Sequence, residues 1–344
     1  MSGSLIVKAP APNGEMGVLF AGSEGDLAAL SASGLLPLVQ RDYVIFALSA
    51  WSPPSPRTYA RIASTCRDPV HVGISHVDDL EMYTTYGPAI VPVPLMSCDW
   101  LSPDDFVPLP MEQRDIDIVM VASWGHYKRH WVLFDALRSL PAHLRVVLVG
   151  GSSEGRTLLD VKRDAALWAV QQDIMFHEDL PISEVNRLQS AARLALQFSG
   201  REGACVAVTE AMMGGTPVGI TADSHIGASV HINQATGRRL PRRNLSHHIR
   251  EMLDSPAGFA PRDWLIENAC CTTSSTSLDH HLECHARGRG GVWTAGIAPV
   301  FRRRQQMHYM DESQGVTLAE AADDLFRLGI ALKGETRPLP QDCH

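Results

Sequence analysis

Residues 199–218 read SGREGACVAVTEAMMGGTPV, and this stretch decides how the chain is interpreted. It holds two carboxylates, Glu202 and Glu210, separated by seven residues around an expected strand-to-helix turn. If the helix begins near Ala204, Glu202 lies just before it and Glu210 lies roughly 9 Å further along its axis. The N–H groups that open a helix attract anions. The stretch therefore predicts a diphosphate on these amides, with carboxylates that accept hydrogen bonds from sugar and ribose hydroxyls.

The residues before and after this stretch alternate between expected strands and helices. We expect strands over 116–122, 145–150, 174–176, 193–198 and 217–220, and helices over 130–140, 156–170, 182–191 and 204–214. Such alternation is typical of a doubly wound parallel sheet. Ligands of these sheets bind outside the carboxyl ends of the strands. We therefore expect the chemistry in the loops at 123–129, 150–155, 177–181 and 199–203.

The chain of 344 residues is long enough for two hydrophobic cores. Its first third predicts strands over 16–21, 43–48, 70–74 and 89–93 and helices over 26–36 and 57–65, before a Pro/Asp-rich stretch at 103–110. We expect a first domain over 1–112 and a second over 113–290. Residues 291–344 form a tail with a helix that can return to the first domain, and the tail region has helical segments near 261–287 and 317–332.

Charge and composition exclude several classes of protein. Lys+Arg 30 against Asp+Glu 38 gives a net charge of −8, which disfavours nucleic acid as a partner. The sequence has no apolar run of the roughly 20 residues that a membrane helix needs, and its start lacks signal-peptide features, so we expect a cytoplasmic protein. The seven cysteines form no Cys-x-x-Cys pair and predict neither a disulfide framework nor a zinc site. A homo-oligomer is compatible with the sequence.

Residues 199–218 resemble the Glu-seven-residues-Glu signature of retaining GT-B glycosyltransferases, family four in particular. Ser-x-x-Glu-Gly, then Glu-Ala-Met, a small residue, Gly and x-Pro-Val occur here in the family's order. The resemblance extends over roughly residues 116–240. It implies an α/β protein of the GT-B fold, with two Rossmann-like domains, of which the amino-terminal one is abbreviated. It also implies transfer of a sugar from a UDP- or GDP-sugar to a small-molecule acceptor through an O, N or S nucleophile.

The same resemblance assigns roles to residues of this chain. It implies that Lys128 binds the leaving phosphate, that Glu202 orients the transferred sugar and that Glu210 anchors the ribose. Lysine is scarce here, with only four in the chain, so its presence at 128 is informative. The donor-binding set is Ser123, Gly150, Gly151, Arg201, Gly203, Ala204, Cys205 and Glu210, and the nucleobase region is Phe176, His177 and Glu178. Neither a metal nor another cofactor is expected.

The chain departs from the family pattern in places. Family members commonly carry an arginine about five residues before the lysine, where this chain has Ser123, and Arg201 is a candidate to supply that charge. The first domain lacks a clear glycine-rich first loop. The arginine-rich, lysine-poor and alanine-rich composition suggests a GC-rich bacterial source, which makes an acceptor from specialised metabolism reasonable.

Two alternative functions remain open from the sequence. Gly151–Gly155 satisfies Gly-x-Ser-x-Gly after a strand, which would make Ser153 the nucleophile of an α/β-hydrolase with a histidine base downstream. A catalytically silent relative that binds nucleotide sugars is the second. Asp115 and Asp117 also match an Asp-x-Asp metal motif, but they open an expected strand and should flank a buried Ile116 by alternation, so we expect no metal there.

Overall fold

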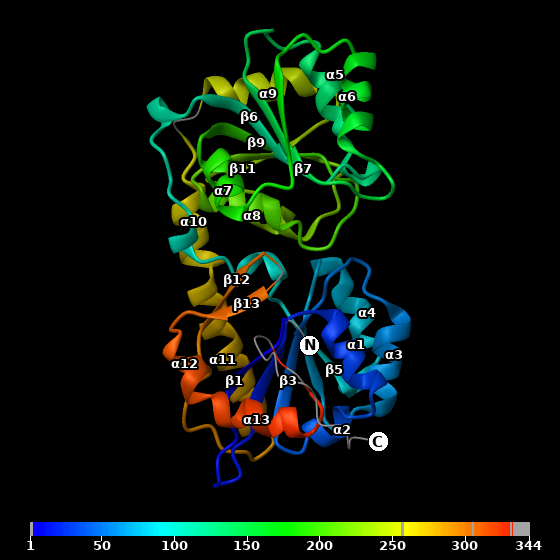
Figure 1. The fold of residues 1–344 in the computed structure, drawn as a ribbon, viewed down its shortest axis with the longest axis vertical. Helices are drawn as coiled ribbons and strands as arrows, with labels where there is room; N and C mark the ends of the chain where they lie inside the picture. The colour runs from blue at the N-terminus through cyan, green and yellow to red at the C-terminus, as the bar shows by residue number, and fades with distance from the viewer. Residues whose placement is uncertain (1–2, 256–257, 305, 331, 333–344) are drawn as a thin grey trace. The chain divides into compact units, whose positions relative to one another are not determined.

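The computed structural model describes residues 3–255, 258–304, 306–330 and 332. The chain divides into two compact units: unit 1 comprises Met1–Ser102 with Cys270–His344, and unit 2 comprises Pro103–Ala269. Each unit contains its own sheet (Figure 1). The divisions fall at 102/103 and 269/270, whereas we expected them near 112 and 290. Helix α11 (Cys271–Gly288) accounts for the second difference, because its Leu278 and Leu282 are buried in the core of unit 1.

Unit 2 is built on six parallel strands in the order β11-β10-β9-β6-β7-β8. Their bounds are β6 Ile116–Val121, β7 Val146–Gly150, β8 Ile174–Glu178, β9 Ala192–Gln197, β10 Val218–Thr221 and β11 Gly237–Leu240. Five of these confirm the expected strands. The sequence analysis missed β11, which reads GRRL and exposes both arginines at the sheet edge, because it has no apolar run.

Helices cover both faces of the unit 2 sheet (Figure 1). Their bounds are α5 His130–Leu137, α6 Leu158–Leu167, α7 Ile182–Ser190, α8 Val206–Met213, α9 Leu245–Asp254 and α10 Pro261–Asn268. The buried side chains of α5 and α9, such as Leu133 and Ile249, share a core with β6, β7 and β9, and α7 and α8 lie on the opposite face. The four helices expected within 130–214 are confirmed.

The order of the strands creates a switch point in unit 2. The chain passes from β6 outward to β7 and β8, and then returns to the other side of β6 to form β9. The loops after β6 and β9 therefore leave the carboxyl edge of two neighbouring strands in opposite lateral directions. In open parallel sheets this is the place where ligands bind.

Unit 1 holds a sheet with the order β1-β2-β3-β4-β5. Its strands are β1 Leu5–Lys8, β2 Gly17–Ala21, β3 Tyr43–Leu48, β4 Val70–Gly73 and β5 Ile90–Val93. Strand β1 pairs antiparallel with β2 and the other pairs are parallel. The four expected strands are confirmed, and the sequence analysis missed β1. The helices of this part are α1 Glu24–Ala32, α2 Leu36–Val39, α3 Pro56–Thr65 and α4 Leu80–Thr84.

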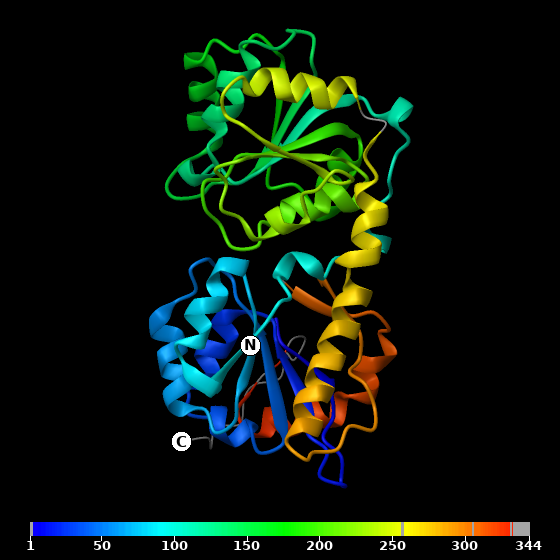
Figure 2. The same cartoon turned by 180° about the vertical axis from the view of Figure 1, so that it is seen from behind.

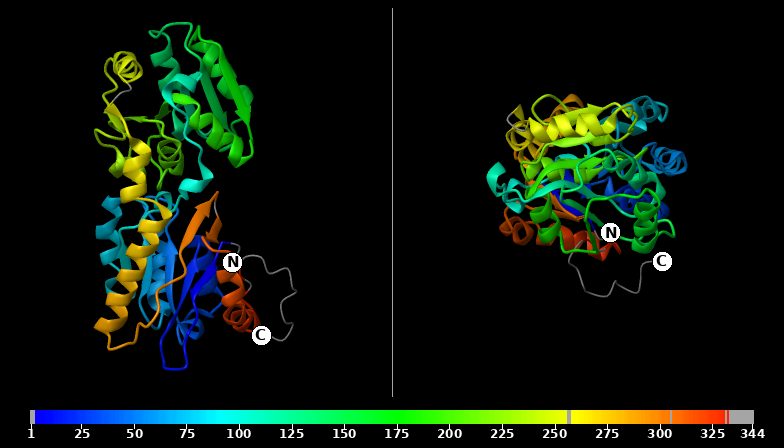
Figure 3. Two further views of the ribbon diagram at one scale, coloured as in Figure 1. Left: turned by 90° about the vertical axis from the view of Figure 1, so that its left-hand side faces the viewer. Right: turned by 90° about the horizontal axis from the view of Figure 1, so that it is seen from above.

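The carboxyl-terminal segment completes unit 1. After α11 it forms a hairpin of β12 (Val300–Arg303) and β13 (Gln306–Tyr309), then α12 (Ser313–Thr317) and α13 (Ala319–Arg327). Helix α11 runs along one face of the sheet and α13 lies on the other (Figures 2 and 3). The expected helix over 261–287 is two helices, α10 and α11. The one expected over 317–332 is α13, and residue 331 lies outside the described residues.

Three further sequence expectations, on membrane spans, cysteines and the Asp-x-Asp motif, can be compared with this fold. Among the residues that the structure describes, no helix combines the length and the apolar character needed to cross a membrane. Six cysteines have free thiols, and Cys343 lies outside the described residues. Asp115 and Asp117 flank the buried Ile116 and pair with Arg145 and Arg193 at the amino end of β6.

Candidate active site

An ion pair between Lys128 and Glu202 lies at the switch point of unit 2. Lys128 ends a 3-10 turn, η6 (His126–Lys128), in the loop after β6, and Glu202 lies in the loop after β9. Lys128 Nζ is 2.6 Å from Glu202 Oε2. The two residues are 8% and 7% exposed, although Lys and Glu are seldom buried unless paired. The fold therefore brings together the two residues that the resemblance marks as catalytic.

The surroundings of the pair keep the lysine charged. Burial acts to lower the pKa of the Lys128 ammonium, but the charge and the hydrogen bond of the Glu202 carboxylate raise it above its usual value. Burial also raises the pKa of the Cys205 thiol well above its usual range, so this thiol is neutral. It donates to Glu202 Oε1 at 3.4 Å. The site thus presents a fixed cation beside a carboxylate oriented by two donors.

Backbone amides extend the positive character of the site. Cys205 precedes α8 with φ of 56°, a left-handed conformation that non-glycine residues rarely adopt. Gly203, Ala204 and Cys205 are buried, and within the described chain their N–H groups donate no hydrogen bond. Buried N–H groups normally find an acceptor. At the start of a helix such amides favour an anion, so this turn offers an anion site next to Lys128.

A cavity of about 420 Å³ opens at the carboxyl ends of β6, β7 and β8. It is lined by Val121, Ala122, Ser123, Tyr127, Lys128, Val149, Gly150, Gly151, Asp179, Leu180 and Val185. The predicted residues Ser123, Lys128, Gly150 and Gly151 therefore meet in one cavity. A Cβ on Gly150 would lie 2.3 Å from the carbonyl oxygen of Ala122, so only glycine fits where the loops after β6 and β7 touch.

The predicted nucleobase residues lie beside this cavity rather than in its wall. Phe176 packs against the unit 2 core, and Glu178 accepts a hydrogen bond from Trp124 Nε1 at 2.8 Å. His177 lies between them on β8 and is half-buried. The two residues that follow, Asp179 and Leu180, do line the cavity. None of the three predicted residues lines the cavity, and the lining residues of this segment begin at Asp179.

Two further predicted residues lie outside this cavity. The Arg201 side chain is exposed, and its guanidinium lies 3.3 Å from His225 Nε2. Glu210 is half-buried on α8. Sequence reasoning missed Arg129, which directly follows Lys128, has φ of 53° and forms an ion pair with Asp223 at 2.9 Å. The Arg129 guanidinium lies 2.5 Å from the point that a Cβ on Gly200 would occupy. Because Gly200 has no side chain, Arg129 can pack against the loop after β9.

The rival nucleophile, Ser153, lies in a tight turn. Its N–H donates to the carbonyl of Arg156 and the Arg156 N–H donates back, at 3.1 and 2.9 Å. Glu154 and Gly155 have positive φ, and α6 starts only at Leu158. Within the described residues no histidine forms a hydrogen bond to Ser153. The glycines of this motif are therefore explained by the turn alone.

Residues 103–270 match the family model described as glycosyl transferases group 1. Unit 2 is a glycosyltransferase group 1 domain. The fold agrees with this match. The Anabaena protein HepE in complex with UDP and glucose superposes with a TM-score of 0.60 at 13% identity, covering 77% of this chain and 77% of that one. For sucrose-phosphate synthase from Thermosynechococcus elongatus the TM-score is 0.56 at 17% identity, covering 76% and 73%.

A glycosyltransferase from Rickettsia africae gives a TM-score of 0.52 at 17% identity, covering 72% of this chain and 71% of that one. Among curated protein sequences, none matches the chain. At these identities the solved structures establish the fold alone, and the fold is GT-B, as predicted. The chain thus has the GT-B fold, and the region that matches the glycosyl transferases group 1 model carries the Lys128–Glu202 pair.

Proposed function

We propose that this glycosyltransferase is a retaining enzyme that moves a sugar from a UDP- or GDP-sugar to a small-molecule acceptor. The observation that carries the proposal is the buried Lys128–Glu202 pair, 2.6 Å apart at the switch point and next to amides without acceptors. The retaining outcome rests on the resemblance of residues 199–218 to the family-four signature. The acceptor nucleophile is an O, N or S atom, and specialised metabolism remains one source of such acceptors.

In this proposal the diphosphate of the donor lies between Lys128 and the amides of 203–205. These groups form a preorganised positive environment in a largely buried site, which stabilises charge that develops on the leaving phosphate. Arg129, in the neighbouring turn, adds positive charge near the same loop. This arrangement takes over the role of the family arginine whose position is occupied by Ser123. The proposal uses no metal ion.

Glu202 holds the sugar. Its carboxylate accepts from Lys128 and from the Cys205 thiol, and carboxylate oxygens have further lone pairs for sugar hydroxyls. The bond from the anomeric carbon to the phosphate oxygen breaks, and the electron pair leaves with the nucleoside diphosphate. The acceptor atom bonds to the same face of the anomeric carbon, and its proton passes to the leaving phosphate oxygen. No carboxylate acts as a nucleophile.

Nucleotide recognition is assigned to the rest of the cavity edge. Glu210 on α8 would accept hydrogen bonds from the ribose hydroxyls. The segment from Phe176 to Leu180, at the end of β8, would border the nucleobase, and Asp179 and Leu180 are its cavity-lining residues. Gly150 and Gly151 keep the loop after β7 free of side chains there.

Two experiments in sequence test the proposal. Thermal unfolding with UDP, GDP, ADP and TDP identifies the base, because a ligand stabilises the native state by RT ln(1 + [L]/Kd). Donor turnover is then followed by proton NMR, which reports the anomeric configuration of the transferred sugar. We expect stabilisation by UDP or GDP and retention of configuration. Inversion would contradict the retaining mechanism, and binding without donor hydrolysis or transfer would favour the catalytically silent alternative.

A further inference from the structure

A cavity of about 240 Å³ lies within unit 1, at the edge of the sheet where the parallel strands begin. Its walls come from the turns before β2, β3 and β4, and from the last turn of α11 with the segment that follows it. Open parallel sheets bind their usual ligands at the opposite edge, outside the carboxyl ends of the strands. The usual binding edge of the fold therefore does not account for this cavity, and the proposed donor site belongs to unit 2.

The ionised groups that line the cavity give it a positive charge. Arg289 donates to Asp68 Oδ1 at 2.8 Å, and Arg67 Nε lies 3.7 Å from Asp68 Oδ2. The Arg41 side chain is exposed and forms no hydrogen bond or ion pair within the described chain. Three arginines against one aspartate leave a net charge of +2. Because a single carboxylate cannot neutralise three guanidinium groups, the lining has the charge that an anion requires.

His285, on α11, extends the polar part of the lining inward. Burial lowers the pKa of its imidazole, the neighbouring Arg289 guanidinium lowers it further, and Asp68 opposes the shift. The ring is therefore neutral at pH 7 and packs edge-on against the buried His71, with 4.4 Å between the ring centres. A neutral imidazole carries one N–H donor, so His285 can donate to an anion without a charge of its own.

One feature of the backbone opposes an anion at this place. The carboxyl end of a helix carries a partial negative charge of about half an elementary charge, and α11 ends at the cavity. The Ala286 carbonyl is already bonded, because it accepts from the N–H groups of Arg289 and Gly291 at 3.1 and 2.8 Å. The net charge of +2 on the lining side chains exceeds what remains of the helix dipole. The balance of charge thus favours an anion.

The rest of the lining is largely apolar. Apolar walls with a few placed polar groups are typical of small-molecule sites. The volume is below the roughly 300–1,000 Å³ of pockets for drug-sized ligands, so the cavity suits a body of about one ring. The apolar and aromatic lining residues are Met16, Tyr43, Val44, Pro69, Ala286 and Val292.

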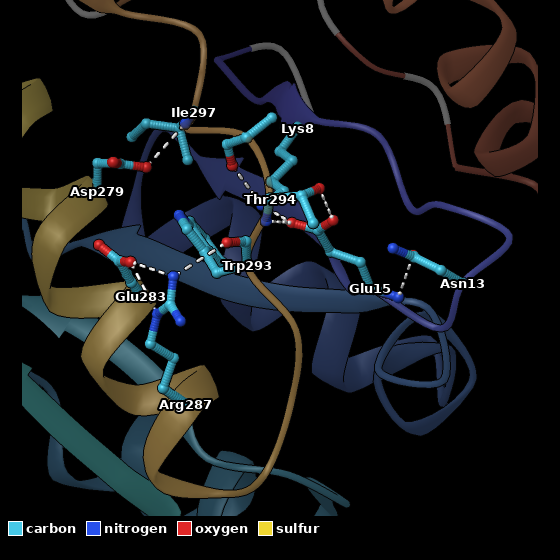
Figure 4. Close-up of polar contacts among 10 residues, drawn as sticks. Lys8, Asn13, Glu15, Asp279, Glu283, Arg287, Trp293, Thr294 and Ile297 are labelled. Carbon is cyan, nitrogen blue, oxygen red and sulfur yellow. Dashed lines mark hydrogen bonds and ion pairs between the residues drawn. The ribbon is translucent and has the colours of Figure 1, made fainter.

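The walls of the cavity are held in place before any ligand binds. The buried Gln40 accepts from the N–H groups of Arg67 and Asp68 at 2.7 and 3.3 Å, and its amide donates to the Asp68 carbonyl at 2.6 Å. On the other side, the segment after α11 is fixed because Glu15 accepts from both the N–H and the hydroxyl of Thr294 (Figure 4). A preformed site reduces the ordering cost of binding.

We propose that this cavity binds a small organic anion, with a carboxylate or phosphate group on an apolar body of about one ring. The anionic group lies among the guanidinium groups of Arg41, Arg67 and Arg289, which form paired hydrogen bonds with either kind of anion. The apolar body packs against the wall formed by Val44 and its neighbours. The site is a second ligand site of the protein, and it does not depend on the proposed sugar transfer.

The first test is a titration of full-length protein followed by ligand-observed NMR. Benzoate and phenyl phosphate carry both features, benzyl alcohol and inorganic phosphate carry one each, and benzylamine carries the wrong charge. We expect benzoate or phenyl phosphate to bind about tenfold or more tightly than the other three, and the tighter of the two identifies the anionic group. Equal binding of benzylamine, benzyl alcohol or inorganic phosphate would overturn the inference. Binding that saturating UDP or GDP abolishes would place the anion in the donor site and would also overturn it.

The second test uses charge changes of opposite sign with a matched control. Arg41→Gln should weaken the anion about fivefold, and because the Arg41 side chain has no partner in the free protein, its loss should not disturb the fold. Asp68→Asn removes the competing carboxylate and should tighten the anion about threefold. Arg57→Gln, an exposed arginine at the start of α3, is the control and should stay within about twofold. Weakening by Asp68→Asn, or equal effects of Arg41→Gln and Arg57→Gln, would contradict the site.

The place of binding is read from histidine signals of the wild-type protein. The imidazole signals of His285 in a proton–nitrogen correlation spectrum are identified by their loss in His285→Gln. Saturating benzoate or phenyl phosphate should shift these signals and leave those of the exposed His143, in unit 2, unchanged. Unchanged His285 signals at saturation would overturn the inference, whatever the variants show.

Discussion

The residues that the structure describes include two buried Lys–Glu pairs, one in each unit, and the two pairs differ in how many hydrogen bonds they form. In unit 1, Lys8 Nζ lies 2.5 Å from Glu15 Oε1, and Glu15 also accepts two hydrogen bonds from Thr294. Lys8 donates to the Ala295 carbonyl at 2.6 Å and sits 3.3 Å from the centre of the Trp293 ring. The Glu15 carboxylate thus accepts from Lys8 and twice from Thr294, and Lys8 also contacts a carbonyl and a ring of the protein (Figure 4).

The pair in unit 2 is bonded less completely. Within the described residues, Lys128 donates only to Glu202, and Glu202 accepts in addition only the thiol of Cys205. Lys128 also lines a cavity of about 420 Å³. Burying ions is costly unless their hydrogen-bonding capacity is used, so the capacity that this pair leaves unused beside a cavity is consistent with the proposed donor site. The same residue types thus fix the segment 293–295 in unit 1 and form the proposed donor site in unit 2.

The largest expected effect is on turnover. Lys128→Ala removes the cation that stabilises the leaving diphosphate, and we expect a loss of about 30- to 1,000-fold in kcat/KM, or roughly 2–4 kcal/mol of transition-state stabilisation. Steady-state kinetics with the donor identified by thermal shift measures this. Lys128→Arg should restore part of the rate, because a planar guanidinium does not replace a compact ammonium. If Lys128→Ala turned over the donor as fast as wild type, Lys128 would have no role in the donor site.

The two glutamates of the group 1 domain should separate by what each binds. Glu210→Gln should weaken the binding of free nucleoside diphosphate by roughly 1–3 kcal/mol, because the proposed ribose contact is lost. Glu202→Gln should leave that affinity nearly unchanged while it lowers turnover, since free nucleotide carries no sugar. Isothermal titration and kinetics on both variants provide the comparison. Equal weakening of nucleotide by both substitutions would mean that the roles are misassigned.

Whether a strand could be predicted from the sequence depends on the length of its apolar run. The unit 2 strands β6, β7 and β9 are apolar runs, and the sequence located them within one or two residues. Strands β1, β12 and β13 have four residues each and lack a flanking turn motif strong enough to reveal them. The tail was expected to be helical, and its hairpin was missed for this reason.

The site residues likewise divide into those that a sequence motif identifies and those that only the fold reveals. Motif spacing identified Lys128 and Glu202 individually, but the residues are 74 positions apart, and only the strand order shows that they touch. The ion pair of Arg129 and the place of Asp179 in the cavity wall depend on loop conformations with positive φ, which motif spacing does not predict. For the same reason the sequence analysis placed the start of α8 near Ala204, whereas Cys205 precedes a helix that begins at Val206.

A smaller effect concerns the strained turn beside Glu202. Cys205 adopts φ of 56°, which costs a non-glycine residue about 1 kcal/mol or more. Cys205→Ala loses the thiol donor and keeps the strain, whereas Cys205→Gly loses the donor but relieves the strain. We therefore expect the glycine variant to have the larger free energy of unfolding, by about 1 kcal/mol, in chemical denaturation. A more stable alanine variant would show that packing of the β-carbon outweighs the backbone strain.

The two pairs should also respond to opposite ends of the pH range. Burial alone would raise the pKa of Glu15, but hydrogen bonds from Lys8 and Thr294 lower it to about 2. Its stabilisation is therefore complete above its ordinary pKa of 4.5 and is lost as the pH falls toward 2. The pKa of Lys128 is raised, so its stabilisation is complete below 10.5 and is lost as the pH rises above that value.

Denaturation across pH measures both effects. Glu15→Gln should flatten the acid limb of the stability profile, and Lys128→Met should flatten the alkaline limb. The result that would contradict this assignment is an acid limb that is unchanged in Glu15→Gln.

The most direct test of the account is a calorimetric titration of two volume-matched double variants with the nucleoside diphosphate that stabilises the wild type. Lys8→Met with Glu15→Gln and Lys128→Met with Glu202→Gln each remove one buried pair without leaving an unpaired charge. If the unit 2 pair is held for the donor, the first variant binds the nucleotide as wild type does, and the second binds it at least about 30-fold more weakly. Equal affinities in the two variants would contradict the claim that the Lys128–Glu202 pair forms the donor site.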